Sequence, residues 1–180
     1  LDLPRVEVSP IADVASFTQN APVLAMTAIG QNAVRSTPLQ MALVAAGVAN
    51  GGQVMVPHVM ADVRDQDGEV VDRFEPTVWT RGTSAAVAST LTDAMTGVVE
   101  RGTATRLAVP GVPTAGKTGT AQLGNGLSHA WIIGFAPSDA PRVAVAVIVE
   151  AQPGASEQTG GRVAAPIAQA VLSAALEARP

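Results

Sequence analysis

The sequence contains no cysteine, which excludes disulfides, thiolate metal sites and cysteine nucleophiles. Its two histidines, His58 and His129, are too few for a histidine-based metal site unless carboxylates contribute. No run reaches the roughly 18–20 apolar residues that a membrane-spanning helix requires, and no signal sequence opens the chain. The chain begins Leu-Asp-Leu-Pro without a methionine, so we expect it to be part of a longer protein.

Charge is also scarce, because only 14% of the residues are charged and the net charge is −4. The arginines are scattered along the chain, whereas a nucleic-acid-binding surface needs a dense basic face. We therefore predict no nucleic-acid partner. With 47% hydrophobic residues and a length of 180, the chain can bury the core of one domain and is not expected to be disordered.

Lysine is the rarest basic residue, since Lys117 is the only lysine among the 11 lysines and arginines. A chain rich in alanine and arginine can simply avoid lysine. Under that bias, the one lysine that is present is a candidate for a chemical role.

Local signals predict three helices. Thr37 as N-cap, Pro38 at the first helical position and Gln40 as capping-box partner predict a helix over 38–49. A second helix is expected over 84–99, capped by Thr83 and stopped by Gly102, and a third over 162–178. Their predicted inner faces are Leu91, Met95, Val98 and Val99 in the second helix, and Val163, Ile167, Val171 and Leu172 in the third.

Strand signals surround these helices. Alternating valines on either side of the Asp-Gln-Asp-Gly turn at 65–68 predict a hairpin with arms 54–64 and 69–74. Strands are further expected at 114–122, 129–136 and 142–150, the last as a buried run of valine and alanine. Residues 1–36 are expected to be irregular, with helical turns near Val14 and Leu24. The order predicts an α+β fold in which an antiparallel sheet is flanked by helices.

Residues 111–118 match the phosphate-loop pattern G-x-x-x-x-G-K-[ST] in full. That pattern requires a helix that begins at the lysine. Here Pro110 and Pro113 interrupt the approach, and Gly119 follows directly after the motif, which disfavours a helix. A nucleotide-binding protein therefore remains an alternative, which a strand at Lys117 would exclude.

The other interpretation takes Lys117-Thr118-Gly119-Thr120 as a strand that is similar to the Lys-Thr-Gly box of penicillin-binding proteins and serine β-lactamases. Further stretches resemble the class B penicillin-binding proteins, most of all the actinobacterial ones, in order and in spacing. These stretches are Ala-Ile-Gly-Gln at 28–31 and residues 37–42, 47–52, 98–104, 115–122, 129–137 and 160–166.

The resemblance implies that the chain is the C-terminal part of a single β-lactamase/transpeptidase-like domain covering residues 1–180. It implies a serine D,D-transpeptidase that cross-links peptidoglycan stem peptides ending in D-Ala-D-Ala, is acylated by β-lactam antibiotics and needs no cofactor or metal. Such enzymes act at the extracytoplasmic face of the cell membrane, so an anchor is expected upstream. The upstream part of the same protein is the expected intramolecular partner.

The resemblance assigns catalytic roles to Lys117, which supplies positive potential, and to Thr120, whose backbone N–H forms half of an oxyanion hole. Thr118, Gly119 and Thr120 are implied to bind substrate, the two threonines through hydroxyl hydrogen bonds to its carboxylate. Gly119 lets a substrate backbone lie beside the strand.

Two family motifs are missing from the chain. No serine has a lysine three positions later, and no Ser-x-Asn occurs. The nucleophile is therefore expected upstream, and this chain alone is expected to be inactive. A non-catalytic sensor or scaffold of the same fold, and a β-lactamase, remain alternatives. His58 and His129 are expected to be structural, and Asp65 and Asp67 to be turn residues.

Overall fold

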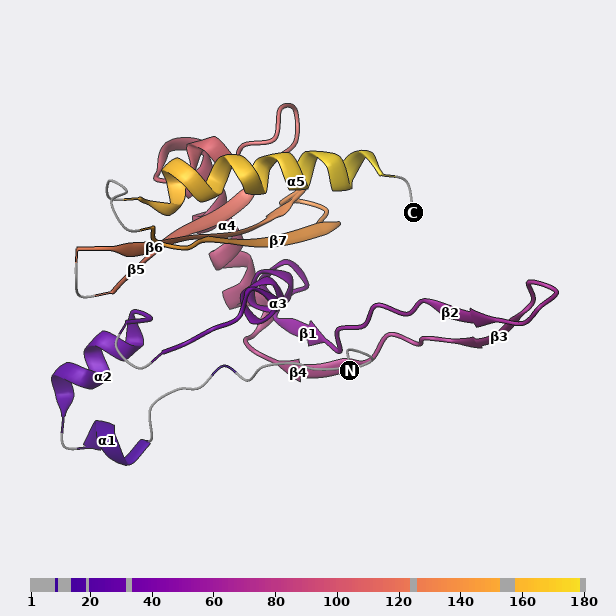
Figure 1. Cartoon of the computed structure of the whole chain (residues 1–180), viewed down its shortest axis with the longest axis horizontal. Helices are drawn as coiled ribbons and strands as arrows, with labels where there is room; N and C mark the ends of the chain where they lie inside the picture. Colours follow the sequence, from indigo (N-terminus) through magenta and orange to yellow (C-terminus); the bar gives the residue numbers. More distant parts are fainter. Residues whose placement is uncertain are drawn as a thin grey trace.

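The structure is a computed structural model that describes Ser9 and residues 14–18, 20–31, 34–123, 126–152 and 158–178. Its centre is an antiparallel three-stranded sheet in the order β5 (Ala115–Gln122), β6 (Ser128–Ala136) and β7 (Val143–Val149). Helix α5 (Ala165–Glu177) covers one face and α3 (Pro38–Ala49) the other (Figure 1). The predicted α+β class, with helices flanking an antiparallel sheet, is confirmed.

The first and second long helices form where their capping signals predict. Helix α3 has the predicted bounds, and the hydroxyl of Thr37 accepts a hydrogen bond from the N–H of Gln40 at 3.1 Å. Helix α4 (Ala85–Arg101) ends at Gly102 as predicted. Its N-cap is Ser84, which accepts from the N–H of Val87 at 3.3 Å, so the prediction of Thr83 is wrong by one residue. Both residue types cap well, and only the backbone conformation distinguishes them.

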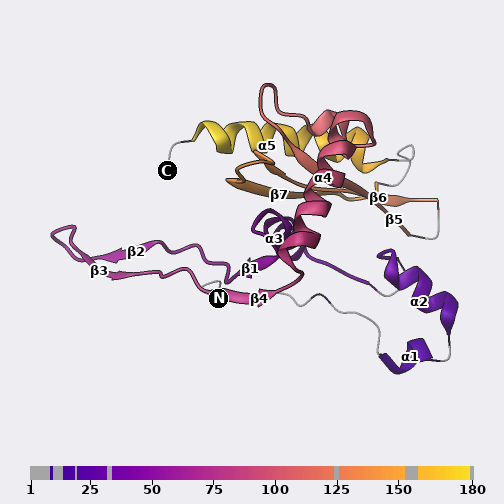
Figure 2. The ribbon, with the colours of Figure 1, turned by 180° about the vertical axis from the view of Figure 1, so that it is seen from behind.

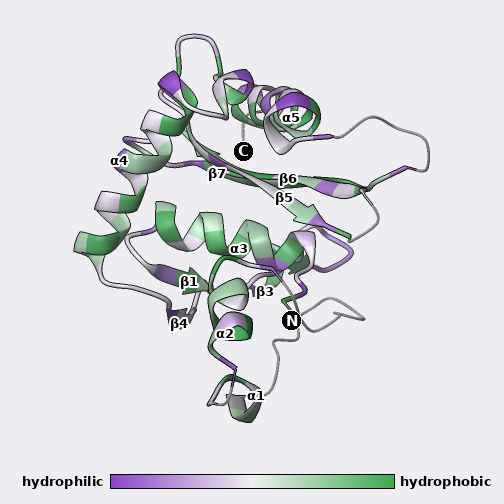
Figure 3. Cartoon of the chain, turned by 90° about the vertical axis from the view of Figure 1, so that its left-hand side faces the viewer, coloured by the Kyte–Doolittle hydropathy of each residue, from purple (hydrophilic) through white to green (hydrophobic). Residues whose placement is uncertain are grey.

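The two faces of the sheet bury separate clusters. On the α5 side, Ile132, Leu107 and Leu172 are fully buried, whereas Phe135 lies on the α3 side with Met95 and Ala115. Helix α4 passes close to β5 (Figure 2) and contributes Met95 to one cluster and Val99 to the other. The sheet, seen between α5 and α3 in Figure 3, is therefore clamped from both sides.

The last helix begins with a π-helical turn, η2 (Gly160–Ala164), and continues as α5. The predicted burial of Leu172 is confirmed, and the rest of the inner face consists of small residues, since Ala164, Ala165 and Ala168 are also fully buried. The predictions of Ile167 and Val171 as inward are wrong, since they are 48% and 47% exposed. Leu91 in α4 is likewise 40% exposed, so its predicted burial is also wrong. The inner face of the last helix therefore combines three alanines with one leucine.

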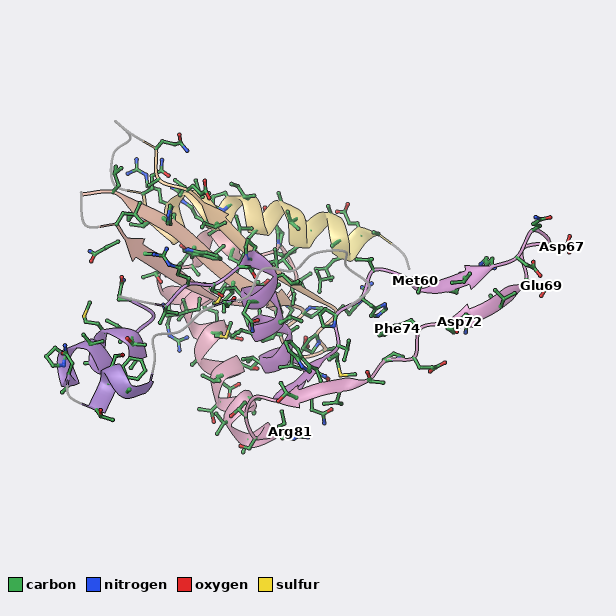
Figure 4. The ribbon with its side chains drawn as sticks, turned by 60° about the horizontal axis from the view of Figure 1, so that its bottom comes forward. Met60, Asp67, Glu69, Asp72, Phe74 and Arg81 are labelled. Carbon is green, nitrogen blue, oxygen red and sulfur yellow. The ribbon has the colours of Figure 1, made fainter. Side chains whose placement is uncertain are left out.

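A long arm projects from the sheet domain, as Figure 4 shows by the labelled residues Met60 to Arg81. Its tip is the predicted hairpin, in which β2 (Asp62–Arg64) pairs with β3 (Val70–Arg73). At its base, β1 (Gln53–Met55) pairs with β4 (Val78–Arg81), a strand that the sequence analysis missed. The predicted hairpin arm over 54–64 is wrong as one continuous strand, since residues 56–61 belong to no strand. Near the tip, Arg64 donates to both carboxylate oxygens of Asp62 at 3.0 and 2.9 Å, and these hydrogen bonds lower the pKa of Asp62.

Two short helices precede α3, as predicted: α1 (Val14–Thr18) and α2 (Ala21–Ala28), which Asn20 caps. After α2 the chain comes close to β5, since Gln31 Nε2 donates to the carbonyl of Thr120 at 3.1 Å. Within the described segments, no helix has the length and apolar character needed to cross a bilayer.

The burial of α5 can be tested by truncating two adjacent side chains. Leu172→Ala removes a fully buried side chain and is expected to lower the free energy of unfolding by about 2–5 kcal/mol. Val171→Ala removes a side chain that is half in water and is expected to cost less than about 1 kcal/mol. Denaturant unfolding of both variants measures the difference, and equal losses would mean that the assigned inner face is incorrect.

Candidate functional site

Strand β5 contains Lys117, Thr118, Gly119 and Thr120 in its middle. One side of the strand pairs with β6, where Lys117 lies opposite Ile133 and Thr120 opposite Ala130. Its other side has no strand partner in the described part of the chain. The strand continues to Gln122 without a helix after Lys117, so the phosphate-loop hypothesis is wrong.

The free side of β5 presents backbone groups of Thr118 and Thr120. The carbonyl of Thr118 accepts a hydrogen bond from Lys117 Nζ at 2.7 Å, and that of Thr120 accepts one from Gln31 Nε2 at 3.1 Å. Both carbonyls therefore point away from β6. In an antiparallel strand the N–H and C=O of one residue point to the same side, so the N–H groups of Thr118 and Thr120 also lie along this edge.

A cavity of about 270 Å³ lies beside this edge. Its floor is formed by residues 117–121 of β5 together with Trp131 and Ile133 of β6. Its opposite wall consists of five residues that lie between α2 and α3, and of Met41 in α3; the five are Ile29, Gly30, Gln31, Val34 and Ser36. Lys117 is exposed here, so its ammonium group can reach a ligand in the cavity.

The side chain of Thr118 lies on the opposite face of the strand, because neighbouring strand residues alternate. Its methyl group is 3.5 Å from where a Cβ on Gly161 of η2 would stand, and its Oγ1 is 2.8 Å from Thr103 Oγ1. The resemblance implies that the hydroxyl of Thr118 binds substrate, and that role stays a prediction. In the structure this hydroxyl shares a hydrogen bond with the hydroxyl of Thr103.

Close packing brings η2 against the site strand. A Cβ on Gly160 would clash with the carbonyl oxygen of Trp131 and would lie 2.9 Å from that of Gly119. A Cβ on Gly119 itself would lie 3.2 Å from the Cβ of Trp131. Backbone oxygen atoms therefore exclude a side chain at Gly160, whereas a Cβ at Gly119 would be tight and would need a small shift of Trp131.

The remaining polar candidates have structural partners, as predicted. His129 Nδ1 accepts from the N–H of Ala151 at 3.0 Å, and His58 stacks on Phe74 at 3.4 Å between ring centroids. Asp65 Oδ1 accepts from the N–H groups of Asp67 and Glu69 across the hairpin turn. In the part of the chain that the structure describes, no group of three His, Cys, Asp or Glu side chains could hold a metal ion.

Gln31 and Thr103 are the two site residues that sequence reasoning missed. Gln31 is 89 positions from Thr120 and Thr103 is 15 from Thr118, so no local periodicity connects them to the strand. Both lie in stretches on which the family resemblance rests, 28–31 and 98–104. Their place in these stretches is the sequence feature that could have marked Gln31 and Thr103 as site residues.

Solved structures with the same arrangement define the class of protein. Penicillin-binding protein A from Mycobacterium tuberculosis, as its penicillin G acyl-enzyme complex, matches with a TM-score of 0.82 and 39% identity over 97% of this chain and 39% of that chain. The D,D-transpeptidase domain of a peptidoglycan glycosyltransferase from Eggerthella lenta gives 0.83 and 32% over 96% of this chain and 43% of that chain. The fold is that of the penicillin-binding transpeptidases.

Sequence comparison agrees with the structural likeness. The family described as penicillin binding protein transpeptidase domain matches residues 12–173. The peptidoglycan D,D-transpeptidase PbpA of Mycobacterium tuberculosis is 41% identical over 100% of this chain and 36% of its own length. This chain belongs to the penicillin-binding-protein transpeptidase family, and it spans little more than a third of the length of that relative.

The contact between η2 and β5 predicts a strong effect of one added methyl group. Gly160→Ala is expected to lower the free energy of unfolding by about 1–3 kcal/mol or more, because backbone oxygen atoms occupy the space. Gly82→Ala is the matched control. Its Cβ would meet nothing nearer than 3.9 Å, so a change within about 0.5 kcal/mol is expected. Thermal or denaturant unfolding compares the two, and a neutral Gly160→Ala would show that η2 can move away from β5.

Proposed function

We propose that the intact protein is a serine D,D-transpeptidase that cross-links peptidoglycan stem peptides and is acylated by β-lactams. This chain, the C-terminal part of its transpeptidase domain, provides the Lys-Thr-Gly strand and half of the oxyanion hole. The likeness to the D,D-transpeptidase PbpA and to the penicillin G acyl-enzyme of penicillin-binding protein A supports the proposal.

The observation that carries the proposal is the free edge of β5, where one cation and two outward N–H groups border one cavity. A D-Ala-D-Ala terminus and a β-lactam both carry a carboxylate, which the ammonium of Lys117 attracts and orients. The N–H of Thr120 donates to the oxyanion that forms when a serine attacks the carbonyl. One such donor stabilises the transition state by about 3 kcal/mol.

Substrate binding follows from the same edge. Gly119 has no side chain above the strand, so a peptide in extended conformation can approach the backbone and pair with it. Thr120 contributes its backbone and lines the cavity. The hydroxyl of Thr118, already paired with Thr103, can still donate or accept a second hydrogen bond, because a hydroxyl has one donor and two acceptor positions.

The nucleophile and its activating lysine are proposed to come from the region upstream of this chain. The absence of Ser-x-x-Lys from the sequence supports this, and so does the outer side of β7. That strand reads Val-Ala-Val-Ala-Val-Ile-Val and has no charged residue to protect its unpaired edge within the described segments, as an exposed edge strand normally has. We propose that upstream residues cover it, and that an upstream anchor holds the protein at the extracytoplasmic face of the membrane.

Labelling with a fluorescent penicillin tests whether the nucleophilic serine lies upstream of this chain. This chain alone is expected to remain unlabelled, whereas the protein that includes the upstream region is expected to form a stable adduct on an upstream serine. Peptide mapping of the adduct identifies the residue. Label on the isolated chain would contradict the proposal, and rapid loss of label through hydrolysis would indicate a β-lactamase instead.

Replacement of the lysine tests the site itself. In the intact protein, Lys117→Ala is expected to slow acylation by penicillin roughly tenfold to a hundredfold, because a charge-assisted hydrogen bond to the carboxylate is lost. The melting temperature is expected to change little, since Lys117 is exposed. Arg73→Ala on the projecting arm removes an exposed cation elsewhere and is expected to leave acylation unchanged. Normal acylation of Lys117→Ala with a large loss of stability would make the lysine structural.

A further inference from the structure

Both outward carbonyls in the centre of β5 are occupied by side chains of the protein itself. Lys117 Nζ occupies that of Thr118, and Gln31 Nε2 occupies that of Thr120 at 3.1 Å. The two donors differ in kind. Lys117 belongs to the strand, whereas Gln31 comes from the opposite wall of the cavity, so its hydrogen bond spans the space that a ligand would enter.

Under the proposed function, a ligand that pairs with β5 must donate a hydrogen bond to an outward carbonyl of this edge. A stem peptide can do so through a backbone amide N–H, and a β-lactam through the N–H of an acylamino side chain. The carboxamide of Gln31 is the same chemical group, an amide N–H donor, and it is bonded to the same kind of acceptor. A carbonyl oxygen has two lone pairs, but Gln31 reaches the carbonyl of Thr120 from the cavity wall, which is the side from which a ligand enters, so ligand and glutamine compete for that carbonyl.

The geometry around Gln31 allows its side chain to leave without the backbone. The N–H of Gln31 donates to the carbonyl of Met26 at 2.9 Å, which ties the residue to the end of α2. The side chain is half-buried at the edge of a cavity of about 270 Å³, so its three rotatable bonds have space in which to turn. The backbone of Gln31 is thus held in place, whereas its carboxamide can turn away from Thr120.

We propose that Gln31 is a competing internal ligand of the substrate strand: its carboxamide holds the carbonyl of Thr120 in the free protein and is displaced by the amide N–H of the stem peptide or β-lactam. This inference rests on the proposed function and adds a specificity element to it. Ligands that carry an amide N–H at this position displace Gln31, whereas ligands without one leave it in place. A structural staple between the two walls would not distinguish the two kinds of ligand.

The test uses the intact protein with its upstream region and two β-lactams. Penicillin G carries an acylamino group, and penicillanic acid has the same fused ring and carboxylate without it. Gln31→Ala and Gln31→Met both remove the donor, and methionine keeps the length of the side chain. Both variants are expected to accelerate acylation by penicillin G roughly twofold to tenfold, the range that one neutral hydrogen bond provides over water. Acylation by penicillanic acid is expected to stay unchanged, as followed by mass spectrometry.

Gln169→Ala is the matched control, because Gln169 is also a half-buried glutamine whose Nε2 donates one 3.1 Å hydrogen bond, here to Ser173 of α5. It is expected to alter acylation by neither compound. Slower acylation by both compounds in Gln31→Ala would make Gln31 a packing support and overturn the inference, whether or not Gln31→Met restores the normal rate. Failure of both compounds to acylate the unmodified protein would instead contradict the proposed transpeptidase.

Discussion

The arrangement of this chain depends on β5 being paired on one side and open on the other. Pairing with β6 holds Lys117 to Thr120 in an extended conformation, and the open side leaves their backbone groups available. The pairing is reinforced by close contacts that only glycine permits. A Cβ on Gly134 would lie 2.7 Å from the carbonyl oxygen of Ala115, and a Cβ on Gly160 would strike that of Trp131. The strand is therefore positioned by backbone contacts, which tolerate little displacement.

Successive side chains of β5 point to opposite faces, so neighbouring residues of the Lys-Thr-Gly motif have different surroundings. Lys117 borders the cavity, whereas the hydroxyl of Thr118 is held by Thr103 on the face that η2 covers. Helices α3 and α5 bury the two faces of the sheet in separate clusters, with Phe135 in one and Leu172 in the other. Because each cluster holds the sheet from its own side, the exposed edge can carry polar groups without contributing to the core. The side chains buried on the two faces thus stabilise the sheet, whereas the backbone groups and Lys117 at the edge of β5 serve the proposed chemistry.

Several apolar side chains of this chain are exposed in the structure. Val171 and Ile167 on α5, Leu91 on α4 and the unpaired edge of β7 are all apolar, and the chain spans 36% of the relative PbpA. The upstream region that is proposed to carry the serine nucleophile would cover part of this apolar surface.

Local sequence signals determined where most elements begin and end: Thr37 and Pro38 start α3, Gly102 ends α4, and the Asp-Gly turn places the hairpin. The Lys-Thr-Gly box and its surroundings also indicated the family, since these short motifs are contiguous in the chain. Sequence assigned the inner face of α5 only in part: Leu172 is buried as predicted, but the way in which the helix rests on the sheet buries Ala168 and leaves Ile167 exposed. It could not find β4, whose partner β1 lies across the whole arm. Only the tertiary structure brought Gln31 to Thr120 across 89 residues and Thr103 to Thr118, because hydrogen bonds between distant segments depend on how the chain returns to the sheet.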